Sequence, residues 1–226
     1  MQKIMAMFFC AVLTVSAYAG DVASFVNLGF SSDGTRFVFG QYGITDSEFR
    51  AYADIFCVDV VQNKFITDGK FSTPPSKATA EKDSRGIFAA LQNSAAPFIK
   101  KLAVDSAQQG RALYVQAENG SKPKSLSFRD FETGYAYAIT LHSITEGGGA
   151  SVRSSFYLSV EVSSPDGKIT RKTVGLPGFK REGVKDYLVR RIITDLSGKS
   201  LIFVIEKEEF NIKGNSVRFM IETLRY

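Results

Sequence analysis

The chain has 226 residues, is 44% hydrophobic and carries a formal net charge of +5, with 28 Lys and Arg against 23 Asp and Glu. This mild basic excess is spread along the sequence, which argues against a nucleic-acid-binding protein. One histidine and two cysteines are too few for a zinc site of the usual His and Cys type, and no Asp-rich calcium loop is present, so we expect no metal and no cofactor.

The N-terminal segment has the layout of a secretory signal peptide. Lys3 precedes an apolar run from Ile4 to Val15, and Ala17 and Ala19 provide the small residues of a cleavage site. The run is too short to span a membrane, so we expect cleavage after Ala19 to remove residues 1–19. No later stretch reaches membrane-spanning length. The sequence therefore predicts an exported protein, either secreted or periplasmic.

Residues 20–226 are expected to form a single mainly-β domain, because they are rich in Val, Ile, Thr, Phe and Tyr and are punctuated by Gly. Near the start, two apolar runs, Phe25 to Phe30 and Arg36 to Gly40, flank Asp33-Gly34. Asp-Gly between such runs is a hairpin signal, since Gly adopts positive φ angles without strain. The run from Ala53 to Val61 then predicts a buried strand.

One region breaks the strand pattern and predicts a helical insertion over about residues 81–107. Polar residues from Ser72 to Ala80 indicate a loop, and the apolar residues that follow recur at helical spacing. Pro97 falls inside this stretch, where it lacks an amide donor and would clash with the preceding turn. We therefore expect either a kinked helix or two short helices that meet near Ser94 to Pro97.

Alternating patterns return in the second half of the chain. Further strands are expected at Arg111 to Ala117, Tyr135 to Ser143, Ser155 to Gly175 with a turn at Pro165-Asp166-Gly167, Tyr187 to Phe210 with a turn at Asp195 to Gly198, and Ser216 to Leu224. The last of these is expected to pair with Leu201 to Glu206. Two connections, Gln41 to Tyr52 and Ser143 to Ser154, look long and are the loops that we expect to contact a ligand.

The sequence offers few residues that could act as a catalytic nucleophile or transfer a proton. His142 is expected on the face of its strand opposite to the core, and no nucleophile-elbow pattern surrounds a serine, so a catalytic role is disfavoured. After removal of Cys10 only Cys57 remains, which excludes an internal disulfide. Cys57 lies in an apolar run and is interpreted as a buried structural thiol.

Two charged clusters offer alternative functions. Glu206, Glu208 and Glu209 provide carboxylates of the kind that glycosidases use, although such a cluster beside Lys207 is typical of a solvated loop. The second cluster is basic. It could bind anionic lipid or cell-wall polymers, but a solvated strand edge is the favoured interpretation. It consists of Lys180, Arg181, Lys185, Arg190 and Arg191.

The opening unit, FSSDGTRFVFG followed by ADIFCVDVVQNKF, resembles a blade of the TolB-type or WD40-like propeller repeat, and RIITDLSGKSLIFVIE resembles a degenerate second copy. With the signal peptide and the C-terminal VRFMIETLRY, these units resemble a bacterial family of predicted secreted proteins, domain of unknown function 2259. The resemblance implies export and carries no established activity, so it assigns no functional residues. At least four blades are needed to close a propeller, and the chain has room for about four at best.

These observations predict a mainly-β fold with one helical insertion, built either as a partial propeller of antiparallel blades or as a two-sheet β-sandwich. The favoured function is a non-enzymatic binding module of the bacterial cell envelope, with an envelope protein or polymer as its partner. The alternatives are an envelope-polymer hydrolase that uses acidic residues and a membrane-surface protein that uses the basic cluster. No catalytic, cofactor or metal-binding residue is assigned.

Overall fold

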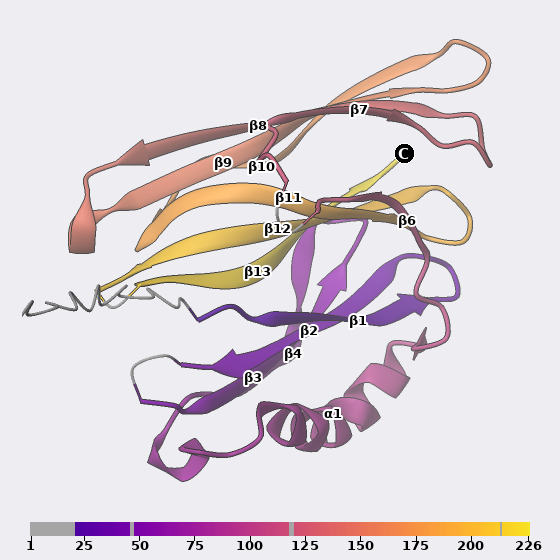
Figure 1. Ribbon diagram of the computed structural model, residues 1–226. Helices are drawn as coiled ribbons and strands as arrows, with labels where there is room; N and C mark the ends of the chain where they lie inside the picture. Colours follow the sequence, from indigo (N-terminus) through magenta and orange to yellow (C-terminus); the bar gives the residue numbers. More distant parts are fainter. Residues whose placement is uncertain (1–20, 46–47, 118–119, 213) are drawn as a thin grey trace, which may run out of the picture.

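The computed structural model describes residues 21–45, 48–117, 120–212 and 214–226, in which three open antiparallel sheets are stacked face to face (Figure 1). In the described part of the chain, one α-helix covers the outer face of the first sheet and forms a fourth layer. The expected mainly-β fold class with one helical insertion is confirmed. The arrangement is consistent with a β-sandwich or with a partial propeller. It contains three sheets, whereas the expected sandwich had two.

The first sheet has the strand order β4-β3-β2-β1-β5. Its strands are β1 (Ser24–Ser31), β2 (Arg36–Ile44), β3 (Ala51–Asp59), β4 (Lys64–Thr73) and β5 (Val104–Asp105). The expected Asp33-Gly34 turn joins β1 to β2. Its Asp33 carboxylate accepts hydrogen bonds from the Ser31 hydroxyl at 2.6 Å and from the Thr35 amide at 3.0 Å. The pKa of Asp33 is lowered to about 2, with the Ser31 hydrogen bond as the largest cause and the Thr35 hydrogen bonds next. The same bonds hold the turn closed.

Helix α1 (Ser84–Lys101) packs against β2 and β3 and is preceded by the short 3₁₀-helix η1 (Lys77–Thr79). The Asp83 side chain caps α1 by accepting hydrogen bonds from two amides of its first turn. The expected break at Pro97 is wrong in its two-helix form, because α1 runs through the proline without interruption. Pro97 removes only one backbone hydrogen bond, one turn before the helix ends, and packing of the apolar face onto the sheet outweighs this loss.

A close approach of backbone and ring fixes the position of α1 on the sheet. A Cβ atom at Gly40 of β2 would lie 2.4 Å from the Phe88 ring of the helix, so only glycine leaves space for that ring. Within the part of the chain that the structure describes, no helix has the length and apolar character needed to cross a membrane.

The second and third sheets are four-stranded, with orders β13-β12-β11-β6 and β10-β9-β8-β7. Their strands are β6 (Arg111–Val115), β7 (Ser125–Arg129), β8 (Ala136–Glu146), β9 (Arg153–Ser163), β10 (Ile169–Glu182), β11 (Val184–Thr194), β12 (Ser200–Asn211) and β13 (Gly214–Arg225), with the 3₁₀-helix η2 (Gly149–Ser151) between β8 and β9. The expected hairpins at Asp166-Gly167 and Asp195 to Gly198 are confirmed, as is the pairing of the last strand with β12.

The middle sheet, which contains β12, is buried on both faces (Figure 1). Along β12, Leu201 and Phe203 contribute to the core shared with the β7–β10 sheet, whereas Ile202 and Val204 contribute to the core shared with the β1–β5 sheet. This arrangement explains the unbroken apolar run in the sequence, because a strand with two covered faces has no solvent-facing positions.

Half of each of the two long loops expected from the sequence is strand, which corrects the length of both loops. Ile44 of β2 pairs with Ala51 of β3, and Glu146 of β8 pairs with Arg153 of β9, so six residues separate the strands in each hairpin. Polar residues at the ends of these two hairpins are compatible with strand, because the hairpin ends extend beyond the hydrophobic cores between the sheets. Glu146 and Arg153 also form an ion pair across the ladder at 3.1 Å.

Candidate functional site

His142 lies on β8, on the face opposite to the core residues Tyr137 and Leu141, as the sequence alternation predicts. Its ring is stacked on Tyr157 at 4.5 Å between centroids, and Nε2 lies 3.0 Å from the Ser159 hydroxyl. Among the described residues, no carboxylate is hydrogen-bonded to the other ring nitrogen, so the orienting group of a catalytic triad is missing here. The arrangement is that of a cross-strand surface pair.

The three clustered glutamates lie within strand β12 and not in the loop that the sequence indicated. Each has a cationic neighbour: Arg190 lies 3.6 Å from Glu206, Lys185 lies 3.4 Å from Glu208, and Lys207 lies 2.8 Å from Glu209. The register of β12 with β13 is uninterrupted, so side chains alternate strictly along this segment. Glu206 and Glu209 are three positions apart and therefore project from opposite faces of the sheet, which is incompatible with two carboxylates flanking one glycosidic bond.

The basic cluster is divided among different surroundings. Lys180 forms an ion pair with Glu146 at 2.7 Å, and the Arg191 guanidinium lies over the Phe25 ring at 5.8 Å. Lys180 and Arg181 belong to β10, which is a sheet edge as expected, but Lys185, Arg190 and Arg191 belong to β11, which is an interior strand. These five cations therefore do not form one solvated strand edge.

Cys57 is fully buried in the core between the first sheet and α1, which confirms the sequence interpretation. Burial in apolar surroundings raises the pKa of its thiol to about 12, because the thiolate would lose its solvation.

We expect the Cys57 thiol of the native protein to react with a water-soluble disulfide reagent at least about a hundredfold more slowly than free cysteine at pH 8, because both access and thiolate fraction are reduced. The reaction is followed by the absorbance of the released thiol, with the same protein in denaturant as the control. Equal rates in the native and unfolded protein would contradict the burial described above.

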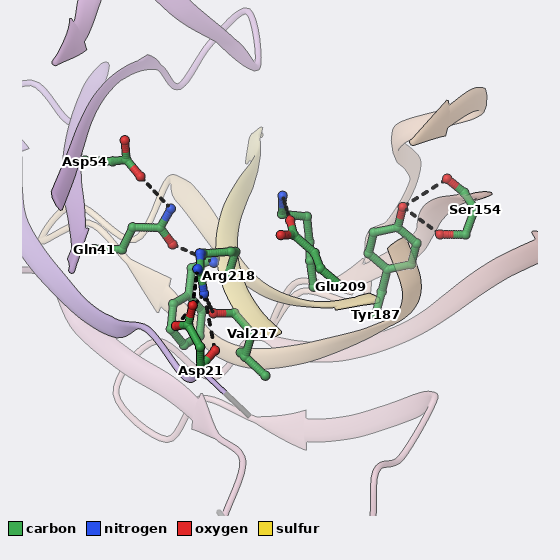
Figure 2. A network of polar contacts seen from close by, with 10 residues as sticks. Asp21, Gln41, Asp54, Ser154, Tyr187, Glu209, Val217 and Arg218 are labelled. Atoms are coloured by element: carbon green, nitrogen blue, oxygen red, sulfur yellow. Dashed lines mark hydrogen bonds and ion pairs between the residues drawn. The ribbon is translucent and has the colours of Figure 1, made fainter. Parts of the chain in front are cut away.

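A polar network joins the first described residues to the last strand (Figure 2). The Arg218 guanidinium of β13 forms an ion pair with the Asp21 carboxylate at 2.6 Å, donates to the Asp21 and Val217 carbonyls, and lies over the Tyr52 ring at 4.2 Å. The Tyr52 hydroxyl donates to Asp21 at 3.1 Å. Gln41 extends the network by accepting from the Phe219 amide at 2.8 Å.

The groups of this network satisfy one another. Gln41 also donates to Asp54, and the separate Tyr187 hydroxyl exchanges hydrogen bonds with Ser154 (Figure 2). A buried network whose donors and acceptors are paired internally leaves no directed group for a ligand. We therefore assign it a structural role, in which it ties the N-terminal segment and β2 to β13.

A second polar arrangement is different, because its residues line a cleft. The edge cleft has a volume of about 310 Å³ and lies where the β3–β4 turn meets β10 and β13, the edge strands of the other two sheets. Its charged lining residues are Lys64, Arg181 and Glu222. Its apolar rim includes Phe65 and Leu176, which are 56% and 61% exposed.

Arg181 is positioned by a wide bulge in β10. Leu176 pairs with Phe156 and Arg181 pairs with Ser154, so residues 177–180 have no partner on β9. The guanidinium carbon lies 5.1 Å from the centroid of the Phe156 ring, 5.0 Å from that of Phe179 and 5.9 Å from that of Tyr187. These rings surround the cation at distances typical of cation–π contacts.

The Arg181 guanidinium has a buried donor without a partner. Its Nη1 atom is buried and forms no hydrogen bond with any residue that the structure describes. Buried donors in proteins are almost always paired, since an unpaired one costs about 1–3 kcal/mol. Such a donor indicates a place where water or a ligand atom completes the arrangement.

Glu222 of β13 contributes the acidic side of the edge cleft. Its carboxylate is 6% exposed and accepts a hydrogen bond from the Asn63 side chain at 2.5 Å. Burial raises the pKa of Glu222, while the Asn63 hydrogen bond and the charge of Arg181 partly offset this effect. No ion pair joins Glu222 to Arg181, although both residues line the same space.

Asn63 fixes the turn that closes this side of the cleft. It adopts a positive φ of 52°, and its side-chain oxygen accepts from the Thr223 amide at 2.7 Å. Asn tolerates this backbone region better than most residues, which is why the turn after β3 is possible at this position. From the sequence, Arg181 was only one cation among five, and nothing in the sequence indicated that Asn63 and Glu222 lie near it.

A wider hollow of about 430 Å³ lies on the outer face of β8, β9 and β10 and serves as a comparison. It contains the hydroxyls of Thr140 and Ser159, and its Arg171 guanidinium is already paired with Glu161 at 2.7 Å. The edge cleft differs from it in having an arginine that is surrounded by aromatic rings and has a buried nitrogen without a partner among the described residues.

Comparison with known proteins places the chain in a family. The model of a family described as "Predicted secreted protein (DUF2259)" matches residues 38–225, a range that includes every charged residue of the edge cleft. Neither the curated proteins nor the solved structures yielded a match, so the propeller-repeat resemblance has no support from a matching protein. The chain therefore belongs to the DUF2259 family of predicted secreted proteins.

Proposed function

We propose that this protein is an exported, non-enzymatic binding protein of the bacterial cell envelope, released by signal cleavage after Ala19. The layout of residues 1–19 and the description of the family as secreted support export. Its partner is an envelope protein or polymer, and it acts outside the membrane.

The edge cleft is the proposed recognition site. The observation that carries this proposal is the Arg181 guanidinium, which aromatic rings hold in place while its buried Nη1 has no partner among the described residues. A cation that is positioned but not neutralised by a hydrogen-bonded carboxylate is prepared to receive an anionic group. The fully paired network around Arg218 offers no comparable group.

The two alternatives have less support. Hydrolysis by Glu206 and Glu209 conflicts with their projection from opposite faces of β12. Membrane-surface binding by the basic cluster conflicts with the pairing of Lys180 with Glu146 and with the division of the five cations between two strands. A recognition role for Arg181 requires neither two carboxylates on one face of the sheet nor a continuous basic surface.

The proposal predicts saturable retention of the purified mature protein on sedimented envelopes of the producing bacterium. Replacing Arg181 with glutamine should reduce that retention at least about fivefold, since a charge-assisted contact is lost. The matched control is Arg171→Gln on the same strand, where the side chain is 72% exposed and the ion pair is superficial, and its retention should equal that of the wild type. The N-terminus of the exported protein is read on the same preparation and should be Gly20.

Absence of retention would refute the binding role. Equal losses in both variants would show that general basic charge, and not the edge cleft, holds the protein on envelopes. Turnover of cell-wall fragments at a constant rate per mole of protein would refute the non-enzymatic assignment.

A further inference from the structure

The lining of the edge cleft divides into a charged side and an apolar side. Arg181 and Lys64 provide positive charge, and Glu222 is the one acidic residue in the described lining. Two cationic side chains against one carboxylate leave the charge balance of the cleft positive, and burial, which raises the pKa of Glu222, adds to it. Such a site selects an anion over a cation.

Apolar contacts form the larger part of the remaining lining. Val58, Met220 and Ile221 contribute from the strands, and the exposed Phe65 and Leu176 side chains stand at the rim. Large apolar side chains that are more than half exposed at a cleft mark a place where apolar surface is covered by a partner or ligand. A volume of about 310 Å³ matches the lower end of small-molecule sites.

The position of the cation relative to the apolar rim sets the shape of the ligand. The Phe156 and Phe179 rings lie about 5 Å from the Arg181 guanidinium carbon, and Arg181 lines the cleft. A guanidinium is a planar donor group of the kind that matches carboxylate, sulfonate or phosphate oxygens. Gly175, which has a positive φ of 96°, lies beside Glu222 in the lining of the cleft.

We propose that the edge cleft binds a small amphipathic anion, with its oxyanion on Arg181 and its apolar part between Phe65 and Leu176. This inference deepens the proposed function and rests on the same site. Glu222 opposes the ligand when it is ionised and assists it when it is protonated, when it donates a hydrogen bond to the oxyanion. Affinity should therefore increase as the pH falls through the pKa of Glu222.

Octane-1-sulfonate, used below its micelle-forming concentration, is the probe, because its charge does not change between pH 4 and pH 8. Titration calorimetry should show one site in the wild type. The dissociation constant should rise about tenfold or more in Arg181→Gln, and by an intermediate factor in Arg181→Lys, which keeps the charge and loses the planar donor pair. In Arg171→Gln it should stay within about twofold of the wild-type value.

Two further compounds test separately the contributions of the anionic group and of the apolar chain of the ligand. Methanesulfonate, which has the anion without the chain, should bind at least about tenfold more weakly, because each buried methylene contributes about 0.8 kcal/mol. Octylamine, which has the chain with the opposite charge, should not bind. In Glu222→Gln the dissociation constant for octane-1-sulfonate should lose its dependence on pH between 4 and 8.

Circular dichroism melting of each variant establishes that it is folded before its affinity is compared. Equal affinity of wild type and Arg181→Gln, equal affinity for methanesulfonate and octane-1-sulfonate, or no binding of the probe at millimolar concentration would each overturn the inference. If the probe fails while Arg181-dependent retention on envelopes persists, the binding role stands and the assigned ligand chemistry is wrong.

Discussion

Replacement of Arg218 by alanine is expected to lower the free energy of unfolding by about 3–5 kcal/mol, the usual cost of removing one partner of a buried ion pair. The Asp21 carboxylate is 3% exposed and would keep its burial while losing the guanidinium 2.6 Å away. Tyr52 would lose the cation over its ring. Urea unfolding at pH 7, followed by far-ultraviolet circular dichroism, measures the change.

A matched control separates the network from a general effect of charge. Arg171→Ala removes an exposed ion pair with Glu161 and should change the free energy of unfolding by less than about 1 kcal/mol. The double variant Asp21→Ala, Arg218→Ala should be less destabilised than the sum of the two single variants, since the lone buried charge is removed. Additive effects would show that the two side chains do not interact.

Truncation of Phe203 to alanine should also cost about 3–5 kcal/mol, because it removes a large side chain from the core between the middle sheet and the β7–β10 sheet. Phe203 is completely buried, and strands on both sides of β12 restrict collapse around the cavity. Thermal and urea unfolding measure the loss, which should appear as a lower midpoint with an unchanged denaturant slope.

Phe131→Ala is the matched control for this core prediction, since the Phe131 side chain is 91% exposed. Its effect on the free energy of unfolding should stay within about 0.5 kcal/mol. A cost below about 1.5 kcal/mol for Phe203→Ala would mean that the two sheets are not closely packed at this position.

Much of the strand layout was predictable because its turns are encoded locally. Asp33-Gly34 and Asp166-Gly167 sit between apolar runs, and in both turns the aspartate side chain bonds to neighbouring groups. These signals depend on a few adjacent residues. The strands that they connect were therefore placed correctly, although β2 was set too short at its Ile44 end. The end of β8 at Glu146, which neither turn adjoins, was also set too short.

The number of sheets was not predicted, although the sequence contains a signal for it. Leu201 to Ile205 is an unbroken apolar run, whereas a strand with one exposed face alternates. That run indicates a strand covered on both sides and hence a middle layer. The sequence left open whether α1 continues through Pro97 or divides into two helices, because the packing against the sheet that decides between them has no local sequence signature.

The edge cleft could not be predicted from the sequence. Its three principal polar residues, Asn63, Arg181 and Glu222, lie in widely separated parts of the chain and meet only because the β3–β4 turn reaches the edges of the other two sheets. Such contacts depend on how sheets stack, which residue patterns do not specify. The sequence did identify Arg181 as a cation, but it grouped that residue with neighbours that point elsewhere.

The tie between Asp21 and Arg218 has a consequence for how the molecule acquires its structure. The two residues are 197 positions apart, and the adjoining bridge pairs Val22 with Val217. A ribosome releases the β1–β4 hairpins long before β12 and β13. The apolar face of the β1–β4 strands that packs on the middle sheet therefore stays uncovered until synthesis is nearly complete. We expect folding to be post-translational and the unfinished polypeptide to be a client of holding chaperones, a state that also suits threading through a secretion channel.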